Sequence, residues 1–395
     1  MPGLRLACRT AAAAAVVLAL AAGAAPAQIM IIGNDEKVRI DADGKATQHE
    51  AGHDTLSVID MSKPAALRMV ATIPLDNTIV GPPTNLAITP SRDIALVANS
   101  VNAVPKDGGI AFVSDNRLFV IDLKANPPAV IATLTLGKKP SGLAINAAGT
   151  LALVTNRDDG TISVLSIAGK EVKVTDTVTI GTGADVVSAV AITPDSKHAL
   201  AVKSAVDKIA VLAIDGGKVT YDKKEDLPAN NYPYNVAIAP NGKIALIANT
   251  GSGGTSDGNA DTVSVIDLEA NPIRVIDHIT VGDSPEGLVI SPKGNIAVTV
   301  EARGSSKPKD TWYYHPGGAV SVLKIAGKKV TKVGEVTVGK LPEGAVFSAD
   351  GNYLYVGNFI DSDLSVLRVS GDRITDTGQR FKLPGHPASM RGGPQ

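Results

Sequence analysis

A short motif recurs at seven places in the chain and limits its fold more than any other feature. In six copies a proline is followed by one variable residue, a small residue and an apolar run of β-forming residues. The copies begin at Pro83, Pro140, Val187, Pro233, Pro285, Pro342 and Pro387. The stretches between them hold further runs rich in Val, Ile, Thr and Ala, separated by turn residues. Self-similar units of this length, built from four short strands, are typical of β-propeller blades.

The residue two positions after each anchor is small in every copy. These residues are Asn85, Gly142, Ala189, Asn235, Gly287, Gly344 and Ser389. A radial array explains this choice, since innermost strands that converge on one axis leave no room for bulky side chains. The second strand of most copies ends in Asn, and the departures from that pattern are Lys203 and Glu301.

The two ends of the chain complete the count of blades. Residues 28–33, 54–60 and 67–74 resemble a second, third and fourth strand, whereas the C-terminal copy at Pro387 supplies a first strand alone. Joining them makes a seventh blade and removes open sheet edges. The sequence therefore predicts an all-β, seven-bladed β-propeller formed by residues 28–395 as a single domain, with one blade closed by N-terminal and C-terminal strands.

The first 27 residues have the pattern of a secretory signal peptide. Arg5 and Arg9 precede an apolar run that is too short to span a bilayer, and Ala25-Pro26-Ala27 fits a cleavage site. We expect cleavage after Ala27 and a periplasmic or secreted protein. The single cysteine, Cys8, would be lost with this segment, so the mature chain would have no disulfide and no thiol nucleophile.

The charge and hydropathy of the chain bear on two classes of partner, nucleic acids and membranes. The formal net charge is −1 and no Lys/Arg cluster is interleaved with aromatics, so nucleic acid is not an expected partner. No further apolar run approaches 18 residues, which predicts that no segment of the mature chain spans a membrane.

The repeats resemble those of the YVTN-type β-propeller family, whose blades carry a Pro-x-Gly start, an SPDG-like turn and a YVxN-like second strand. The matching segments are SPKG at 291–294, APNG at 239–242, TPDS at 193–196 and YVGN at 355–358. The resemblance implies the fold and relates the chain to lactonase-like propellers and surface-layer propeller proteins. It does not imply one function, because this scaffold serves many.

Aromatic residues indicate where a binding surface would lie. The chain has only 1 Trp, 7 Tyr and 5 Phe. Six of these 13 fall in loops on one face of three consecutive blades, here called the top face, where second strands lead to third strands. They are Tyr232, Tyr234, Trp312, Tyr313, Tyr314 and Phe359. Clustered aromatics favour a binding surface; alternatively, the long loop after Glu301 covers the edge of its own blade.

Charged residues on the same face are candidates for catalysis. Glu286 and Glu343 occupy the variable position of two anchors, and Glu301, Arg303 and His315 lie at or in the long loop. Carboxylates paired with His and Arg near the axis would suit acid–base chemistry or cation binding. The alternative is a solvated rim with scattered ion pairs.

His49-Glu50-Ala51-Gly52-His53 matches the HExxH zinc signature. That chemistry needs a helix to bring both His to one face, whereas this segment contains Gly52 and leads directly into a strand. A loop site formed by His49 and His53, with His386 as a third ligand, is a weak alternative. We expect no cofactor.

Three functions are compatible with these features. The favoured one is an exported binding module that holds a small molecule or a periplasmic protein on its top-face loops. The alternative is a lactonase-like hydrolase with a Glu/His/Arg set in the funnel. A metal- or quinone-linked redox protein ranks below both.

Overall fold

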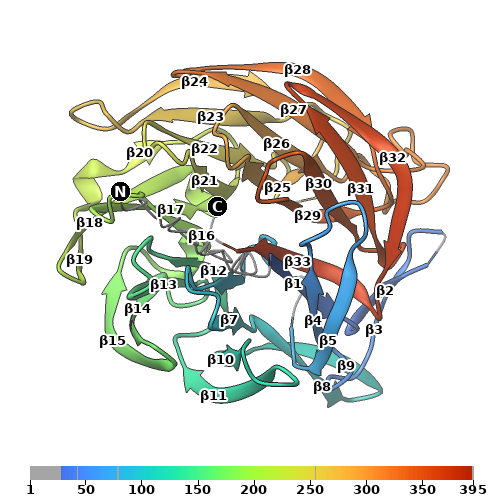
Figure 1. The fold of residues 1–395 in the computed structure, drawn as a ribbon, viewed down its shortest axis with the longest axis horizontal. Helices are drawn as coiled ribbons and strands as arrows, with labels where there is room; N and C mark the ends of the chain where they lie inside the picture. Colours follow the sequence, from blue (N-terminus) through green and yellow to red (C-terminus); the bar gives the residue numbers. More distant parts are fainter. Residues whose placement is uncertain (1–27, 42, 78–79, 254, 394–395) are drawn as a thin grey trace, which may run out of the picture.

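The computed structural model describes residues 28–41, 43–77, 80–253 and 255–393. Seven antiparallel sheets are arranged around one axis as the blades of a propeller (Figure 1). The fold is therefore the expected all-β, seven-bladed propeller. The expected signal peptide falls on residues 1–27, outside the described residues. No helix in the described ranges is long and apolar enough to cross a membrane.

The strands of each blade follow one another from the axis outward. Blade 1 consists of β33 (His386–Gly392), β1 (Ile29–Asp35), β4 (Thr55–Asp60) and β5 (Arg68–Pro74). Blade 2 consists of β6 (Leu86–Ile88), β7 (Ile94–Ala98), β10 (Arg117–Asp122) and β11 (Ala129–Thr135). Blade 3 consists of β12 (Pro140–Ile145), β13 (Leu151–Asn156), β14 (Thr161–Ala168) and β15 (Glu171–Thr179). Blade 4 consists of β16 (Val187–Ile192), β17 (His198–Lys203), β18 (Lys208–Asp215) and β19 (Lys218–Tyr221), with β20 (Leu227–Pro228) also on β18.

Each of the remaining three blades has four strands in sequence order. Blade 5 consists of β21 (Pro233–Ile238), β22 (Ile244–Asn249), β23 (Thr262–Asp267) and β24 (Arg274–Thr280). Blade 6 consists of β25 (Pro285–Ile290), β26 (Ile296–Glu301), β27 (Ala319–Ala326) and β28 (Lys329–Thr337). Blade 7 consists of β29 (Pro342–Phe347), β30 (Tyr353–Asn358), β31 (Asp363–Ser370) and β32 (Arg373–Lys382).

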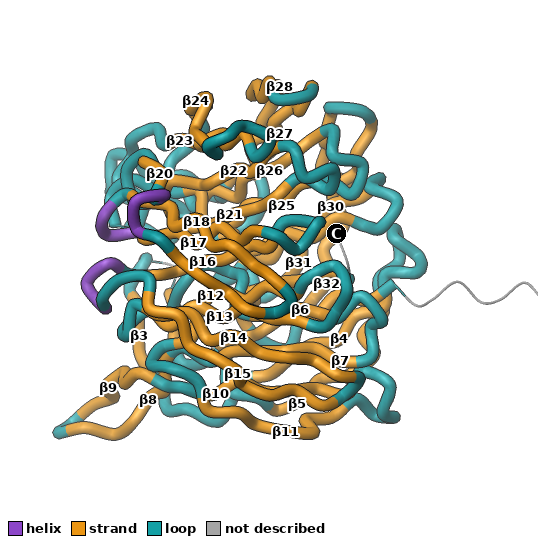
Figure 2. Tube along the Cα trace, turned by 90° about the vertical axis from the view of Figure 1, so that its left-hand side faces the viewer, coloured by secondary structure: helices purple, strands orange, loops and turns teal. Residues whose placement is uncertain are grey.

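Additional elements extend the top-face loops. They are the hairpins β2 (Val38–Ile40)/β3 (Ala46–Gln48) and β8 (Val101–Lys106)/β9 (Gly109–Ser114), and the 3₁₀ turns η1 (Gly183–Asp185) and η2 (Ser204–Val206). A third 3₁₀ turn, η3 (Lys223–Glu225), interrupts the outer strand of blade 4 between β19 and β20. The helical turns and the β8/β9 hairpin project from the same side of the molecule (Figure 2). The top face is thus the elaborated one.

Crowding at the axis explains the small residues of the repeat. A Cβ added at Gly142 would lie 2.4 Å from the Ala189 Cα of the next blade. A Cβ added at Gly287 would lie 2.4 Å from the Glu343 carbonyl oxygen. Because real Cβ atoms do not approach so closely, a side chain at either position would push two innermost strands apart.

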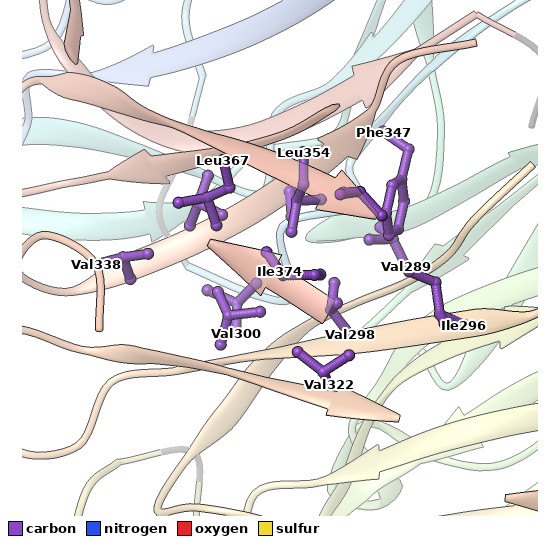
Figure 3. Close-up of a cluster of buried hydrophobic side chains, with 14 residues drawn as sticks. Val289, Ile296, Val298, Val300, Val322, Val338, Phe347, Leu354, Leu367 and Ile374 are labelled. Atoms are coloured by element: carbon purple, nitrogen blue, oxygen red, sulfur yellow. The ribbon is translucent and has the colours of Figure 1, made fainter. Parts of the chain in front are cut away.

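Apolar side chains pack between neighbouring blades and hold them together. Between blades 6 and 7, Val298, Val300 and Val322 meet Leu354 and Leu367 (Figure 3). Full burial of each such side chain contributes about 1.5–3 kcal/mol. Similar clusters lie between the other blades. They explain how the described residues, which include no cysteine, can hold this shape.

The asparagines that end second strands have a structural role. The Asn156 side chain donates to Thr161 Oγ1 at 2.9 Å and to Ser163 Oγ at 3.0 Å on the third strand. Asn358 donates in the same way to its own third strand, and its Oδ1 accepts from the Gly339 backbone N–H at 3.0 Å. These asparagine side chains thus satisfy polar groups around the turn.

Blade 1 is closed as the sequence predicts. The C-terminal β33 pairs antiparallel with the N-terminal β1, from Met30 opposite Gly392 to Asp35 opposite His386. Met30 and Met390 are buried in one cluster with residues of blade 7. The pairing of the two ends therefore also completes the packing of the neighbouring blade.

Deletion of residues 386–395 should lower the melting temperature by about 5 °C or more. It removes one ladder of hydrogen bonds and the buried Met390, whose loss alone costs about 2–5 kcal/mol. Differential scanning calorimetry would measure this. The control is a chain shortened at the exposed β8/β9 tip, residues 106–109, which should melt within a degree or two of the full protein. Equal melting of the 386–395 deletion and the full chain would contradict the closure.

Candidate functional site

A pocket of about 270 Å³ opens on the top face near the axis. The charged and aromatic side chains that line it are Arg157, Tyr232, Tyr234, Glu286 and Glu343. Three of these occupy the variable position of the anchors of blades 5, 6 and 7, so the repeat itself places Tyr234, Glu286 and Glu343 side by side.

Two carboxyl groups that line this pocket, Glu286 and Glu343, share a hydrogen bond. Burial raises the pKa of Glu286 to about 7, while its bond to Glu343 and one from Ser284 oppose the rise. Burial and the neighbouring Glu286 charge raise the pKa of Glu343 well above its usual range. Glu343 is buried and Glu286 is half-buried. The Glu343 carboxyl therefore keeps its proton and donates it to Glu286, because like charges repel strongly in a partly dehydrated pocket.

Glu343 has unused hydrogen-bonding capacity. Its side chain is 2% exposed, and its Oε2 atom has no hydrogen-bond partner among the residues that the structure describes. A buried polar atom without a partner costs about 1–3 kcal/mol. An atom in this state beside a pocket points to a ligand group that would pair with it.

Tyr232 and Tyr234 form an aromatic wall beside the carboxyl pair. Their rings stack with centroids 6.2 Å apart and planes inclined by 29°. Burial and the nearby Glu286 raise the pKa of Tyr234, so its hydroxyl remains a hydrogen-bond donor at neutral pH. The Tyr232 backbone donates to Asp207 Oδ1 at 2.8 Å, which anchors the wall to blade 4.

The backbone at Tyr232 is left-handed, with φ at 52°. The residues that precede four other innermost strands share this conformation: Lys139, Val186, Ser284 and Leu341. Such strain often marks functional sites, but its repetition in five blades makes it here a property of the turn that enters each innermost strand.

Arg157 is the functional candidate that the sequence did not reveal. It lies in the short turn after Asn156 in blade 3, and its Nη1 is buried without a hydrogen-bond partner in the described part of the chain. A Cβ at Gly81 would lie 3.0 Å from this atom, so Gly81 leaves the space that the guanidinium occupies. Among the described residues that line the pocket, Arg157 supplies the positive charge.

The other charged candidates lie elsewhere. The Glu301 carboxylate is buried within blade 6, where it accepts from the Gly282 N–H at 3.1 Å and the Thr299 hydroxyl at 2.8 Å. It thus occupies the position that the structural asparagine has in blades 1, 2, 3, 5 and 7. Arg303 pairs with Glu335 on the outer strand β28 at 2.8 Å. His315 is exposed, and its Nδ1 lies 3.0 Å from the Tyr313 carbonyl oxygen. These three side chains do not join Glu286 and Glu343.

The aromatic candidates divide into separate groups. Trp312 is 79% exposed and meets Tyr313 edge-on, with centroids 5.1 Å apart, beside Gly258 of the blade 5 loop. Neither these two nor Tyr314 lines the pocket. Phe359 is fully buried and stacks on His386 at 5.0 Å. The long loop also packs on its neighbours, since the Ser305 hydroxyl accepts from the Leu341 N–H. Only Tyr232 and Tyr234 of the six therefore face the pocket.

Two of the three histidines of the zinc hypothesis contact other groups, and the third is exposed. His49 Nε2 lies 3.0 Å from Thr47 Oγ1, His53 is exposed in the loop before β4, and His386 Nδ1 lies 2.8 Å from the Phe359 carbonyl oxygen. In the described ranges, no group of three or more His, Cys, Asp or Glu residues could hold a metal ion. The segment is not helical, so it lacks the geometry that the HExxH signature requires.

Comparison with known proteins places this molecule among seven-bladed propellers with lactonase-like structural neighbours. No family model and no curated protein sequence matches the chain. Among solved structures, the periplasmic gluconolactonase of Pseudomonas aeruginosa is similar, with a TM-score of 0.68, 16% identity and coverage of 93% of this chain and 99% of that one. A functionally unknown protein of Desulfotomaculum acetoxidans has a TM-score of 0.66 and 15% identity, with 92% and 98% covered. The hydrazine synthase of Kuenenia stuttgartiensis has a TM-score of 0.59 and 17% identity, with 80% and 90% covered. At these identities the likeness concerns the fold alone.

The carboxyl pair predicts a pH dependence of stability. Raised pKa values mean that the folded state binds more protons than the unfolded state between pH about 5 and pH about 8. The pair's contribution to the free energy of unfolding is fully present below the usual glutamate pKa of about 4.3. It is lost as the pH rises through the Glu286 pKa of the folded state, near 7. Between pH 5 and 8 the wild type should therefore lose roughly 5 °C more in melting temperature than the Glu286→Gln/Glu343→Gln variant.

The matched control is Glu335→Gln, which removes a carboxylate from the outer rim. Its melting temperature should follow the wild-type dependence on pH. Parallel curves for the wild type and the double variant would show that the pair does not titrate as described.

Proposed function

We propose that the top-face pocket binds a small molecule rich in hydroxyl groups, of the size of a monosaccharide. The observation that carries this proposal is the Glu286–Glu343 pair, in which a buried oxygen of Glu343 lacks a partner among the described residues. A hydroxyl of the ligand would donate to that oxygen. This fit does not require the pair to lose its proton.

The remaining wall suits the same ligand class. Stacked Tyr232 and Tyr234 offer an apolar face and hydroxyl donors, and Arg157 offers N–H groups that donate to the oxygen atoms of a ligand. The volume of about 270 Å³ lies at the small end of small-molecule sites, which span about 300–1,000 Å³. A bulky or strongly apolar ligand fits this pocket less well.

Export of the mature chain to the periplasm and membership of the YVTN-type repeat family are part of this proposal. They are supported by the n-region, apolar run and cleavage motif before Gln28, and by the SPKG and YVGN segments. N-terminal sequencing of the protein from a periplasmic fraction should begin at Gln28. A full-length chain that starts at Met1 in the cytoplasmic fraction would contradict export.

Isothermal titration calorimetry with a panel of aldoses, sugar acids and their lactones tests the binding site. Glu343→Leu should weaken binding by about tenfold or more, since it removes the oxygen that accepts the ligand hydroxyl and the donor to Glu286. Tyr232→Ala should weaken it by removing the stacking wall. Glu335→Gln, an exposed carboxylate on β28, is the matched control and should bind as the wild type does. Binding that is equal in all four proteins would place the ligand elsewhere.

Hydrolysis of a sugar lactone is the second candidate function, and the proton shared by Glu286 and Glu343 favours it. In such a reaction the Glu286 carboxylate would take a proton from a water molecule that attacks the lactone carbonyl carbon. Arg157 would stabilise the oxyanion, and Glu343 would protonate the ring oxygen as the acyl–oxygen bond breaks. The fold shared with a gluconolactonase agrees with this candidate without establishing it.

The same panel separates the two functions. A lactonase should hydrolyse a lactone at a rate that falls about 100-fold or more in Glu286→Gln, with a KM changed much less. A binding module should show calorimetric binding with no hydrolysis above the rate in buffer. His315→Ala and Glu301→Gln would reduce hydrolysis only if the Glu301, Arg303 and His315 set, rather than the Glu286–Glu343 pair, did the chemistry.

A further inference from the structure

The innermost strand of blade 1 departs from the other six at one position. The fourth residue after the anchor is Ala or Val in blades 2 to 7 but Arg in blade 1. These residues are Ala87, Ala144, Ala191, Ala237, Val289, Val346 and Arg391. At the next position five isoleucines and a phenylalanine correspond to Gly392. Blade 1 thus brings a long cationic side chain to a level of the channel where the others bring small apolar ones.

Arg391 lines a cavity of about 330 Å³ at the bottom of the channel. The walls come from the ends of the innermost strands and the turns that follow them, including Ile145, Ile192 and Ile238. No described residue is shared with the top-face pocket. The cavity is therefore a second site, at the opposite end of the axis from Glu286 and Glu343.

The Arg391 guanidinium is poorly compensated there. Its Nε donates to the Leu86 carbonyl oxygen at 3.2 Å, and its two terminal nitrogens donate to no residue in the described part of the chain. Among the described residues that line the cavity there is no Asp or Glu. Burial lowers the pKa of Arg391 to about 10, so the group still carries its charge at neutral pH.

Arg391 is half-buried, so its charge is partly withdrawn from water and would gain from a counter-ion that pairs with it. The planar guanidinium offers two parallel N–H groups, a geometry that matches a carboxylate. The alanines and isoleucines around it would contact an apolar body. The site thus combines a head-group partner with a wall for a hydrocarbon tail.

We propose that the bottom of the channel binds an amphiphilic monocarboxylate, with its carboxylate on Arg391 and its alkyl chain along the Ala and Ile wall. The small volume favours a medium-length chain over a long one. This site is independent of the function proposed for the top face. The competing role for Arg391 is purely structural, as a link from blade 1 to the Leu86 carbonyl of blade 2.

Titration calorimetry with sodium decanoate below its micellar concentration tests the site. The wild type should bind decanoate, and Arg391→Gln should bind it at least about tenfold more weakly, because the charge-assisted pair is lost. Arg391→Lys should retain part of the affinity. The matched control is Arg368→Gln, which removes an exposed arginine on β31 and should bind as the wild type does. Glu343→Gln should also be unchanged, which separates this site from the top pocket.

If Arg391→Gln fails to fold, ligands with other head groups can be titrated into the wild type instead. Decyltrimethylammonium has the same tail with a positive head, and acetate and chloride have the charge without the tail. Selective binding of decanoate supports the proposal. Equal affinity for decanoate in wild type and Arg391→Gln, equal binding of decyltrimethylammonium, a response to acetate and chloride alone, or no binding at all would each overturn it.

Discussion

Crowding of seven innermost strands around one axis is the constraint on which this molecule depends. Gly142 and Gly287 lie so close to the next strand that a Cβ could not be added without separating blades. Small residues at the axis allow the blades to approach, and this approach brings Val298 and Val300 against Leu354 in the layer outside it. The apolar clusters between blades therefore exist only because the residues nearest the axis are small.

The same crowding brings reactive side chains together on the top face. The variable residue of each anchor precedes the small one, and the convergence of the strands brings these variable residues together from all blades. Where blades 6 and 7 both place glutamate there, two carboxyls meet in a buried setting and share a proton. A propeller can thus acquire an acid–base pair by two substitutions in its repeat, without any new loop.

Much of the fold and part of the site could be predicted from the sequence. The anchors and the incomplete runs at both ends determine the number of blades and their closure, and the position of Glu286, Glu343 and Tyr234 in the repeat places them together. The sequence does not predict a role for Arg157, because its turn is short and resembles those of other blades. Its side chain reaches the pocket because Gly81, in another part of the chain, leaves space for the guanidinium. Glu301, Arg303 and His315 are close in sequence, but alternation along β26 turns Glu301 into the blade and the loop directs Arg303 to the outer rim. Such directions depend on tertiary contacts that a repeat pattern does not contain.

The pairing of β33 with β1 has a consequence for the order of folding. Met30 is among the first described residues to leave the ribosome, whereas its partner Gly392 is among the last. Until β33 has been synthesised, the inner edge of β1 lacks its neighbour and blade 7 lacks Met390. Non-local pairing of this kind delays completion of the fold and leaves a bare strand edge during synthesis. Closure of blade 1 by β33 thus protects the strand edges of the complete ring but leaves the incomplete ring exposed during synthesis. The whole fold therefore depends on the pairing of β33.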